Sequence, residues 1–183
     1  MYSDELKGKF KEWTGAKVVV MAEDAEVLAD GGASDFRGNG QPNFTPVRAD
    51  QVVHDGDKVQ LGDVTLVAHL TAGHTKGCTS WSTDTEENGR KYNIVFSCSM
   101  RMNTNIPLLN NPKYPNIVSD LEKGFKTLRS LKPFMEGYKE YLDEYEKMFV
   151  DQLKVEKAGG LPYSVGTKPL PPCPQDGRKC YGV

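Results

Sequence analysis

The chain has 183 residues, with 23 Lys and Arg residues against 25 Asp and Glu residues and a formal net charge of −2. This length fits one ordinary domain, and the balanced charge gives no electrostatic reason to expect nucleic acid or a membrane surface as a partner. Hydrophobic residues make up 38% of the chain, which is enough for a buried core and excludes wholesale disorder. The longest apolar run, residues 18–22, is too short to span a bilayer. The first residues do not resemble a signal peptide, so the sequence leaves localisation open.

Apolar residues in the N-terminal third follow first a helical and then a strand-like pattern. Leu6, Phe10 and Trp13 recur at spacings of four and three, which places them on one helical face. Gly15 ends this helix, and the glycines and prolines after the next two elements indicate a loop. The expected elements are a helix over residues 3–14, a buried strand over 17–21, a second helix over 23–29 and a loop over 32–50.

The middle of the chain is predicted to form two β-hairpins on either side of a glycine-bounded loop. Apolar residues alternate at period two in the first hairpin, and Gly62 with Asp63 is typical of a two-residue turn. The loop that follows carries His74 at the end of a strand, where mixed α/β proteins commonly place ligands. The expected strands are residues 58–61 and 64–70, then 78–83 and 91–97, with the second turn at 86–89.

The last third of the chain changes to long amphipathic helices. Apolar residues recur at helical spacing over residues 117–131 and 134–153, and Pro133 separates the two segments. The order of elements predicts a mixed α/β fold whose sheets are covered by helices. We expect a domain over residues 1–160 and a mobile, Pro-rich tail over residues 161–183.

The cysteines and histidines are few for a disulfide scaffold or a histidine-rich metal site. Cys78 and Cys98 lie in apolar, strand-like surroundings and are expected to be buried free thiols. Cys173 and Cys180 lie in the tail, where a small disulfide loop, weak metal binding and free thiols all remain open. The chain has three histidines, which are few for an enzyme that binds zinc through histidine side chains.

One segment resembles a known family. Residues 71–81 read T-A-G-H-T-K-G-C-T-S-W, which closely resembles the T-P-G-H-T-x-G motif of the metallo-β-lactamase superfamily. The trailing Cys-Thr-Ser-Trp is similar to subclass B3 of the zinc β-lactamases. Further similar segments lie at residues 14–18, 31–36, 53–57 and 110–115, so that the resemblance covers roughly residues 5 to 160.

The resemblance implies an αββα sandwich with one or two zinc ions at the edge of its sheets. In that family a zinc-activated hydroxide opens the amide of a β-lactam, and the proteins are typically periplasmic or secreted. His74 matches the histidine that completes the three-histidine zinc site, so it is the metal ligand that the resemblance assigns to this chain. A β-lactam-type small molecule would be the substrate, and zinc the cofactor.

The sequence departs from the family pattern at the other ligands. The family's H-x-H-x-D-H motif would lie upstream of Asp4, and the last zinc histidine would lie in a stretch that is skipped between Leu131 and Phe134. We therefore expect a partial αββα sandwich that is truncated at its N-terminus and lacks an internal segment. Since only His74 remains of the expected ligands, we expect little or no activity, and no residue is assigned a catalytic role.

Other side chains are weaker candidates for the site. His54 is expected in a solvated turn, His69 on a strand pointing away from the loop, and Cys98 near a position where other subclasses carry a zinc cysteine. Ser97 or Ser99 would bind a substrate carboxylate if this part of the family pattern applies. The alternative function is a non-catalytic remnant that self-associates through exposed sheet edges.

Overall fold

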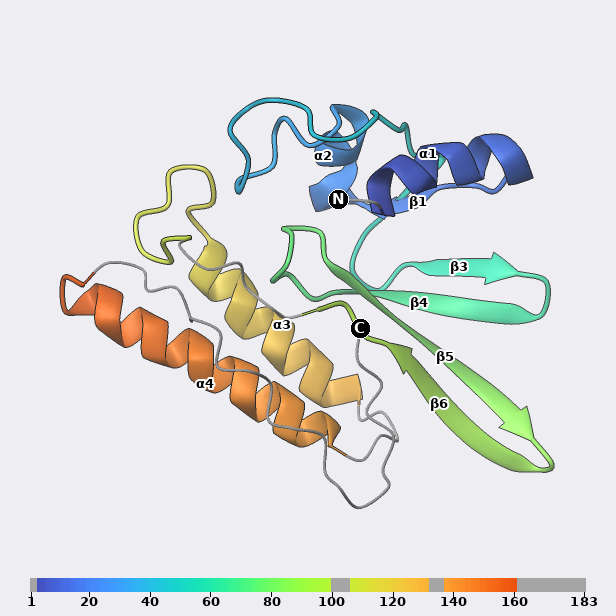
Figure 1. Ribbon diagram of the computed structural model, residues 1–183. Helices are drawn as coiled ribbons and strands as arrows, with labels where there is room; N and C mark the ends of the chain where they lie inside the picture. Colours follow the sequence, from blue (N-terminus) through green and yellow to red (C-terminus); the bar gives the residue numbers. More distant parts are fainter. Residues whose placement is uncertain (1–2, 100–105, 132–136, 161–183) are drawn as a thin grey trace, which may run out of the picture.

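The computed structural model describes residues 3–99, 106–131 and 137–160. These residues form two small sheets and several helices, with α3 and α4 lying side by side (Figure 1). The elements are α1 (Ser3–Thr14), β1 (Val19–Met21), the 3-10 helix η1 (Ala22–Asp24), α2 (Ala25–Ala29), β2 (Gln51–Val53), β3 (Lys58–Leu61), β4 (Val64–Leu70), β5 (Thr79–Glu87), β6 (Arg90–Phe96), α3 (Ile117–Leu131) and α4 (Tyr138–Lys157).

The N-terminal elements largely follow the predicted pattern. Helix α1 ends as expected at Gly15, which has a φ of 68° and donates its N–H to the carbonyl of Lys11 at 2.9 Å. Strand β1 is shorter than predicted and pairs in parallel with β2, Val20 opposite Val52. Strand β2 was not predicted, because two of its three residues are exposed and its partner lies about thirty residues earlier in the chain.

The two predicted hairpins are confirmed and form one antiparallel sheet in the order β3-β4-β5-β6. The first hairpin turns at Gly62, as predicted. The second hairpin is longer than predicted, because Glu87 pairs with Arg90 and only Asn88 and Gly89 form the turn. Both turn residues have positive φ, 52° and 77°, as a two-residue turn between twisted strands requires.

Helices α3 and α4 enclose the larger of the two apolar clusters in the described residues, which we call the helix core. Helix α3 has its predicted bounds, whereas the predicted start of the next helix at Phe134 lies outside the described residues. The rings of Phe125 and Phe149 lie 6.2 Å apart between α3 and α4. The buried members of the helix core are Phe36, Leu108, Tyr114, Ile117, Leu121, Phe125, Leu128, Tyr138, Leu142, Phe149 and Leu153.

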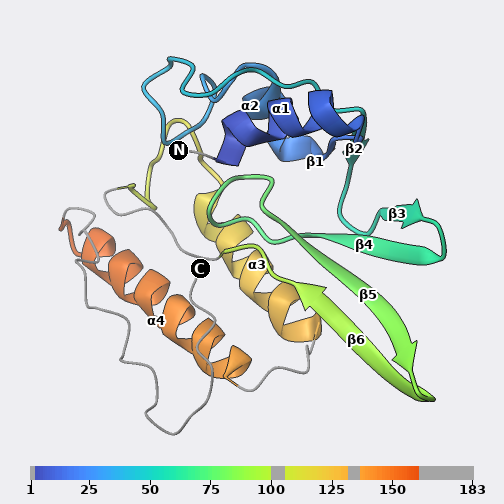
Figure 2. The same cartoon turned by 45° about the vertical axis from the view of Figure 1, so that its right-hand side comes forward.

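The smaller cluster, which we call the sheet core, lies between the two sheets. Its buried members are Met21, Val53 and Ala68, from β1, β2 and β4. Ala68 lies opposite Trp81 and Trp81 opposite Phe96, so one face of the four-stranded sheet continues beyond the region that β1 and β2 cover. Figures 1 and 2 show the turn end of the β5–β6 hairpin projecting away from the labelled helices.

The described helices give no sign of a membrane span. None of those in residues 3–99, 106–131 and 137–160 is both long and apolar enough to cross a bilayer. The predicted tail over residues 161–183 lies outside the described part of the chain.

Candidate functional site

The candidate site is the loop that joins β4 to β5 and carries His74. Thr71 closes its base: the Thr71 N–H donates to the carbonyl of Cys78 at 2.8 Å, and the Thr71 and Ser80 hydroxyls are 2.8 Å apart. Gly73 donates its N–H to the carbonyl of Thr75 at 3.1 Å, which tightens the turn. The loop is therefore a closed structure whose two ends are pinned together.

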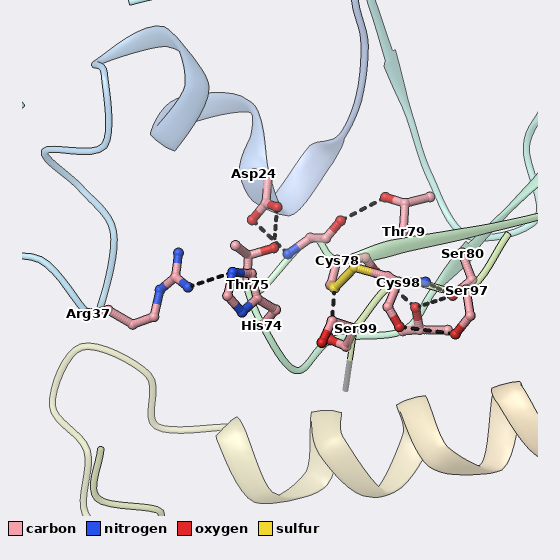
Figure 3. The surroundings of a disulfide bond; sticks show 12 residues. Asp24, Arg37, His74, Thr75, Cys78, Thr79, Ser80, Ser97, Cys98 and Ser99 are labelled. Carbon is pink, nitrogen blue, oxygen red and sulfur yellow. Dashed lines mark hydrogen bonds between the residues drawn. A yellow bond between two sulfur atoms is a disulfide. The ribbon is translucent and has the colours of Figure 1, made fainter. Parts of the chain in front are cut away.

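The side chain of Asp24 holds the far side of this loop. Its carboxylate accepts the N–H of Gly77 at 2.7 Å and also accepts the hydroxyl of Thr75 (Figure 3). Burial raises the pKa of the Asp24 carboxyl, while the two hydrogen bonds act to lower it. Two residues of the recognised motif thus bind one carboxylate at the end of η1, on either side of Lys76.

Gly77 has to be a glycine because of this carboxylate. A Cβ atom on Gly77 would lie 2.6 Å from Cγ and 2.7 Å from the backbone nitrogen of Asp24. Both distances are below ordinary van der Waals contact, and the second involves backbone that cannot rotate away. The close approach of Asp24 therefore explains the second glycine of the motif.

A further contact fixes the loop from the side of α3. Lys76 donates to the carbonyl of Lys113 at 2.9 Å, and its ammonium lies 5.2 Å from the centre of the Tyr114 ring. Tyr114 belongs to the helix core. The loop is thus tied both to the N-terminal part of the chain and to the segment before α3.

His74 itself is exposed at the tip of the loop and contacts Arg37. Nη1 of Arg37 lies 3.3 Å from Nε2 of His74 (Figure 3). Arg37 is in turn bound by Asp35, with Nε 3.0 Å from Oδ1. Burial acts to raise the pKa of Asp35, but the hydrogen bonds and charge of Arg37 outweigh it and hold the pKa below its usual value.

Asp35 and Arg37 were not among the predicted site residues. Asp35 lies within the family-like segment 31–36, and Arg37 follows it directly. The contact of Arg37 with His74 spans 37 residues and depends on how the loop after α2 folds back. The only signal in the sequence was the resemblance of that segment.

Cys78 and Cys98 form a disulfide, so the prediction of two buried free thiols is wrong. The pairing of Trp81 with Phe96 brings the ends of β5 and β6 together, and the two Cα atoms are 5.9 Å apart. Cys98 was a candidate zinc ligand, but its sulfur is part of this disulfide and is therefore not a free thiolate. Cys173 and Cys180 lie outside the described residues.

The other two histidines lie away from His74, as expected. His69 points to Ser82, with its Nε2 2.8 Å from the hydroxyl, and burial lowers its pKa against the opposing charge of Asp55. His54 is exposed, and its Nδ1 is 3.6 Å from the carboxylate of Asp57. Neither ring joins His74 in the structure.

The donor set does not fit a zinc ion. Among residues 3–99, 106–131 and 137–160, no three His, Cys, Asp or Glu side chains are placed to hold a metal together. A catalytic zinc needs about three protein ligands and keeps one open position. The assignment of His74 as a metal ligand therefore remains a prediction from the motif.

The two serines that are predicted to bind a substrate carboxylate lie in the segment that directly follows β6. The Ser97 hydroxyl donates to the carbonyl of Cys98 at 3.1 Å, and Ser99 is exposed at the end of the described segment. Met100 and Met102, which follow, lie outside the described residues. Binding of a carboxylate by Ser97 or Ser99 stays a prediction.

Comparison with solved structures gives a consistent set of similar proteins, whereas no protein-family model matches the chain. The native FEZ-1 metallo-β-lactamase from Legionella gormanii is 31% identical, with a TM-score of 0.77 over 85% of this chain and 71% of that one. The class B3 di-zinc metallo-β-lactamase LRA-12 from an Alaskan soil metagenome is 30% identical, with a TM-score of 0.72 over 79% and 66%. BJP-1 of Bradyrhizobium japonicum, a subclass B3 enzyme, is 26% identical, with a TM-score of 0.70 over 85% and 69%.

Proposed function

Because the chain belongs to the subclass B3 metallo-β-lactamase family, we propose that it is a metallo-β-lactamase-like protein with little or no β-lactam hydrolysis of its own. Family members are zinc-dependent hydrolases of β-lactams, and the fold confirms the partial α/β sandwich that the resemblance implied. A β-lactam-type molecule is the substrate class to test first.

One observation carries this proposal: His74 stands without further ligands in the described part of the chain. Its Nε2 faces the guanidinium of Arg37, while His54 and His69 point elsewhere. A single imidazole does not hold a catalytic zinc ion. The loop around His74 is nevertheless firmly built by Asp24 and Gly77, which supports a protein that keeps the family's framework.

The test is to measure zinc content and hydrolysis on the same sample. The 183-residue chain and its His74→Ala variant are incubated with Zn²⁺, freed of unbound metal and assayed with a chromogenic cephalosporin. We expect well below one zinc ion per chain, and equal background rates for both proteins with or without chelator. One or two zinc ions per chain, with chelator-sensitive hydrolysis that His74→Ala abolishes, would contradict the proposal.

The exposed strand residues favour a second candidate, an interaction protein that pairs with a second copy of itself. Leu61 on edge strand β3 and Phe96 on edge strand β6 are 82% and 58% exposed. Val64, in β4 beside Leu61, is 52% exposed. Apolar side chains on open edges promote pairing between sheets.

Sedimentation over a range of protein concentrations tests this candidate. We expect a dimer at high concentration that Leu61→Ser and Phe96→Ser weaken. Val155→Ser is the matched control, since Val155 is an exposed apolar residue on α4, 38% exposed and away from the sheet edges. A chain that stays monomeric at every concentration, or a dimer that only Val155→Ser weakens, would contradict it.

A further inference from the structure

The guanidinium of Arg37 lies against the ring nitrogen that His74 would otherwise offer to a metal. Nη1 of Arg37 is 3.3 Å from Nε2 of His74. A guanidinium can only donate hydrogen bonds and stays charged, so Nε2 must be the acceptor and the proton of the neutral ring must be on Nδ1. We infer that Arg37 is a positioning residue that fixes this tautomer of His74 and competes with metal ions for Nε2.

The guanidinium is not a loose surface group, because Asp35 and Phe36 hold it in place. Nε of Arg37 lies 3.0 and 3.1 Å from the two carboxylate oxygens of Asp35, and the Arg37 N–H donates to the same carboxylate at 2.9 Å. The Asp35 side chain is only 10% exposed. Such a forked, charge-assisted contact fixes both the position and the plane of the guanidinium.

The aromatic neighbours extend this support into the helix core. Cζ of Arg37 lies 5.8 Å from the centre of the Phe36 ring, and that ring meets Tyr114 edge to face with centres 5.0 Å apart. Both rings are buried members of the helix core. Because Asp35 and Phe36 orient the guanidinium, its direction toward His74 is set by the fold.

Two effects of Arg37 then act against a metal at His74. A metal ion would need the same Nε2 lone pair that accepts the hydrogen bond, so the two cannot be bound together. The positive charge of Arg37, which Asp35 offsets in part, also acts against a divalent cation at short distance. The inference uses the proposed function only in taking His74 as the loop's candidate ligand.

The tautomer is the direct readout. Long-range ¹H–¹⁵N spectra of the chain, recorded at mildly alkaline pH where histidines are generally neutral, distinguish Nδ1–H from Nε2–H for each ring. We expect His74 to be Nδ1–H in the wild type. In Arg37→Met we expect the ratio of the two tautomers to shift about ten-fold, the size that one charge-assisted hydrogen bond produces.

Matched variants separate this contact from a general loss of structure. Arg129→Met removes an arginine that pairs with Asp143 and Glu146 between α3 and α4, and it should leave the His74 tautomer unchanged. Asp35→Asn keeps Arg37 but removes its charged partner, so the tautomer ratio should shift in the same direction by a smaller factor. An Nε2–H tautomer in the wild type, or an equal ratio in wild type and Arg37→Met, would overturn the inference.

A titration with Zn²⁺ alone, followed on the His74 ring signals, tests the competition. We expect Arg37→Met to respond at about ten-fold lower Zn²⁺ than the wild type, because one hydrogen bond no longer opposes the metal. The exposed ring of His54 in the same sample is the internal reference and should respond equally in both proteins. Equal responses of His74 would overturn the competition, whereas tightly bound zinc in the wild type would contradict the proposed function and not the tautomer.

Discussion

The helix core and the sheet core differ in how completely they are closed. The helix core is bounded by α3, α4 and the segments around Phe36 and Leu108, and its rings pack directly on each other. The sheet core has three buried members, and the sheet face that it shares ends in the exposed side chains of Ile94 and Phe96. The difference indicates that apolar burial stabilises the helix side, whereas the sheet side depends more on a covalent bond and on polar contacts.

The largest effect is expected in the helix core, at Phe125. This ring is 2% exposed and lies between α3 and α4. Phe125→Ala leaves a cavity among well-packed neighbours and should lower the free energy of unfolding by about 3–5 kcal/mol. Urea denaturation followed by circular dichroism measures it, and a loss below about 1 kcal/mol would contradict a closed helix core.

The disulfide is expected to carry much of the stability of the sheet side. Cys78 and Cys98 are 20 residues apart in sequence, and cross-linking a loop of this length stabilises a fold by about 3 kcal/mol. The double variant Cys78→Ser, Cys98→Ser should lose about that amount in urea denaturation. The wild type under reducing conditions is the control and should match the variant. An unchanged denaturation midpoint in both would show that the disulfide does not stabilise the sheet side.

The polar contact of Asp24 is expected to contribute less than the disulfide. Asp24→Ala removes both carboxylate oxygens, so Thr75 and Gly77 lose their shared acceptor. A buried donor without a partner costs about 1–3 kcal/mol. Hydrogen exchange at the amide of Gly77 should accelerate in the variant, and unchanged exchange there would show that the carboxylate does not hold the loop.

The pH dependence of Asp24→Ala follows from the raised pKa of Asp24. The native state holds this proton more tightly than the unfolded state, so Asp24 lowers the stability of the wild type as the pH rises above the ordinary value of 3.8. The decrease ends once the pH has passed the raised pKa. Alanine does not titrate, so the stability difference between variant and wild type should move in favour of the variant over this window. A difference that is constant with pH would contradict the burial of this carboxyl.

The smallest effect on stability is expected at the open end of the sheet face. Phe96 is 58% exposed, so Phe96→Ala should change the free energy of unfolding by no more than about 0.5 kcal/mol. Phe96→Ala and Phe125→Ala are the same chemical change, so the difference between their losses in free energy of unfolding compares the two regions most directly. A loss as large as that of Phe125→Ala would mean that the sheet face is covered in solution, and sedimentation of the same sample would identify a second copy as the cover.

Much of the fold was predictable because its elements are long and periodic. The alternation in β3 and β4 and the helical spacing of α3 are local patterns, and each gave nearly the observed bounds. The three-residue strand β2 carries no such pattern and depends on β1, which lies far away in sequence. Short strands of this kind are decided by tertiary pairing and not by propensity.

The candidate site was predictable only through the motif. The motif identified His74 and its loop, but Asp24, which holds the loop, lies 51 residues before Thr75, and Arg37 lies 37 residues before His74. The disulfide was missed because free, buried cysteines and paired ones have the same local surroundings. What joins Cys78 to Cys98 is the register of β5 on β6, which no spacing in the sequence specifies. The metal role of His74, the domain over residues 1–160 and the mobile tail stay predictions.

The disulfide also makes the β5–β6 hairpin a covalent ring. Cys78 precedes β5 and Cys98 follows β6, so both strands lie inside the closed loop, and the exposed turn at Asn88 and Gly89 is its far end. A protease that cut the chain at this turn would leave two fragments that stay joined by the disulfide and by the strand pairing of residues 81–87 with residues 90–96. The tip of the hairpin is therefore a place where the chain can be opened, or a peptide inserted, without releasing the loop that carries His74.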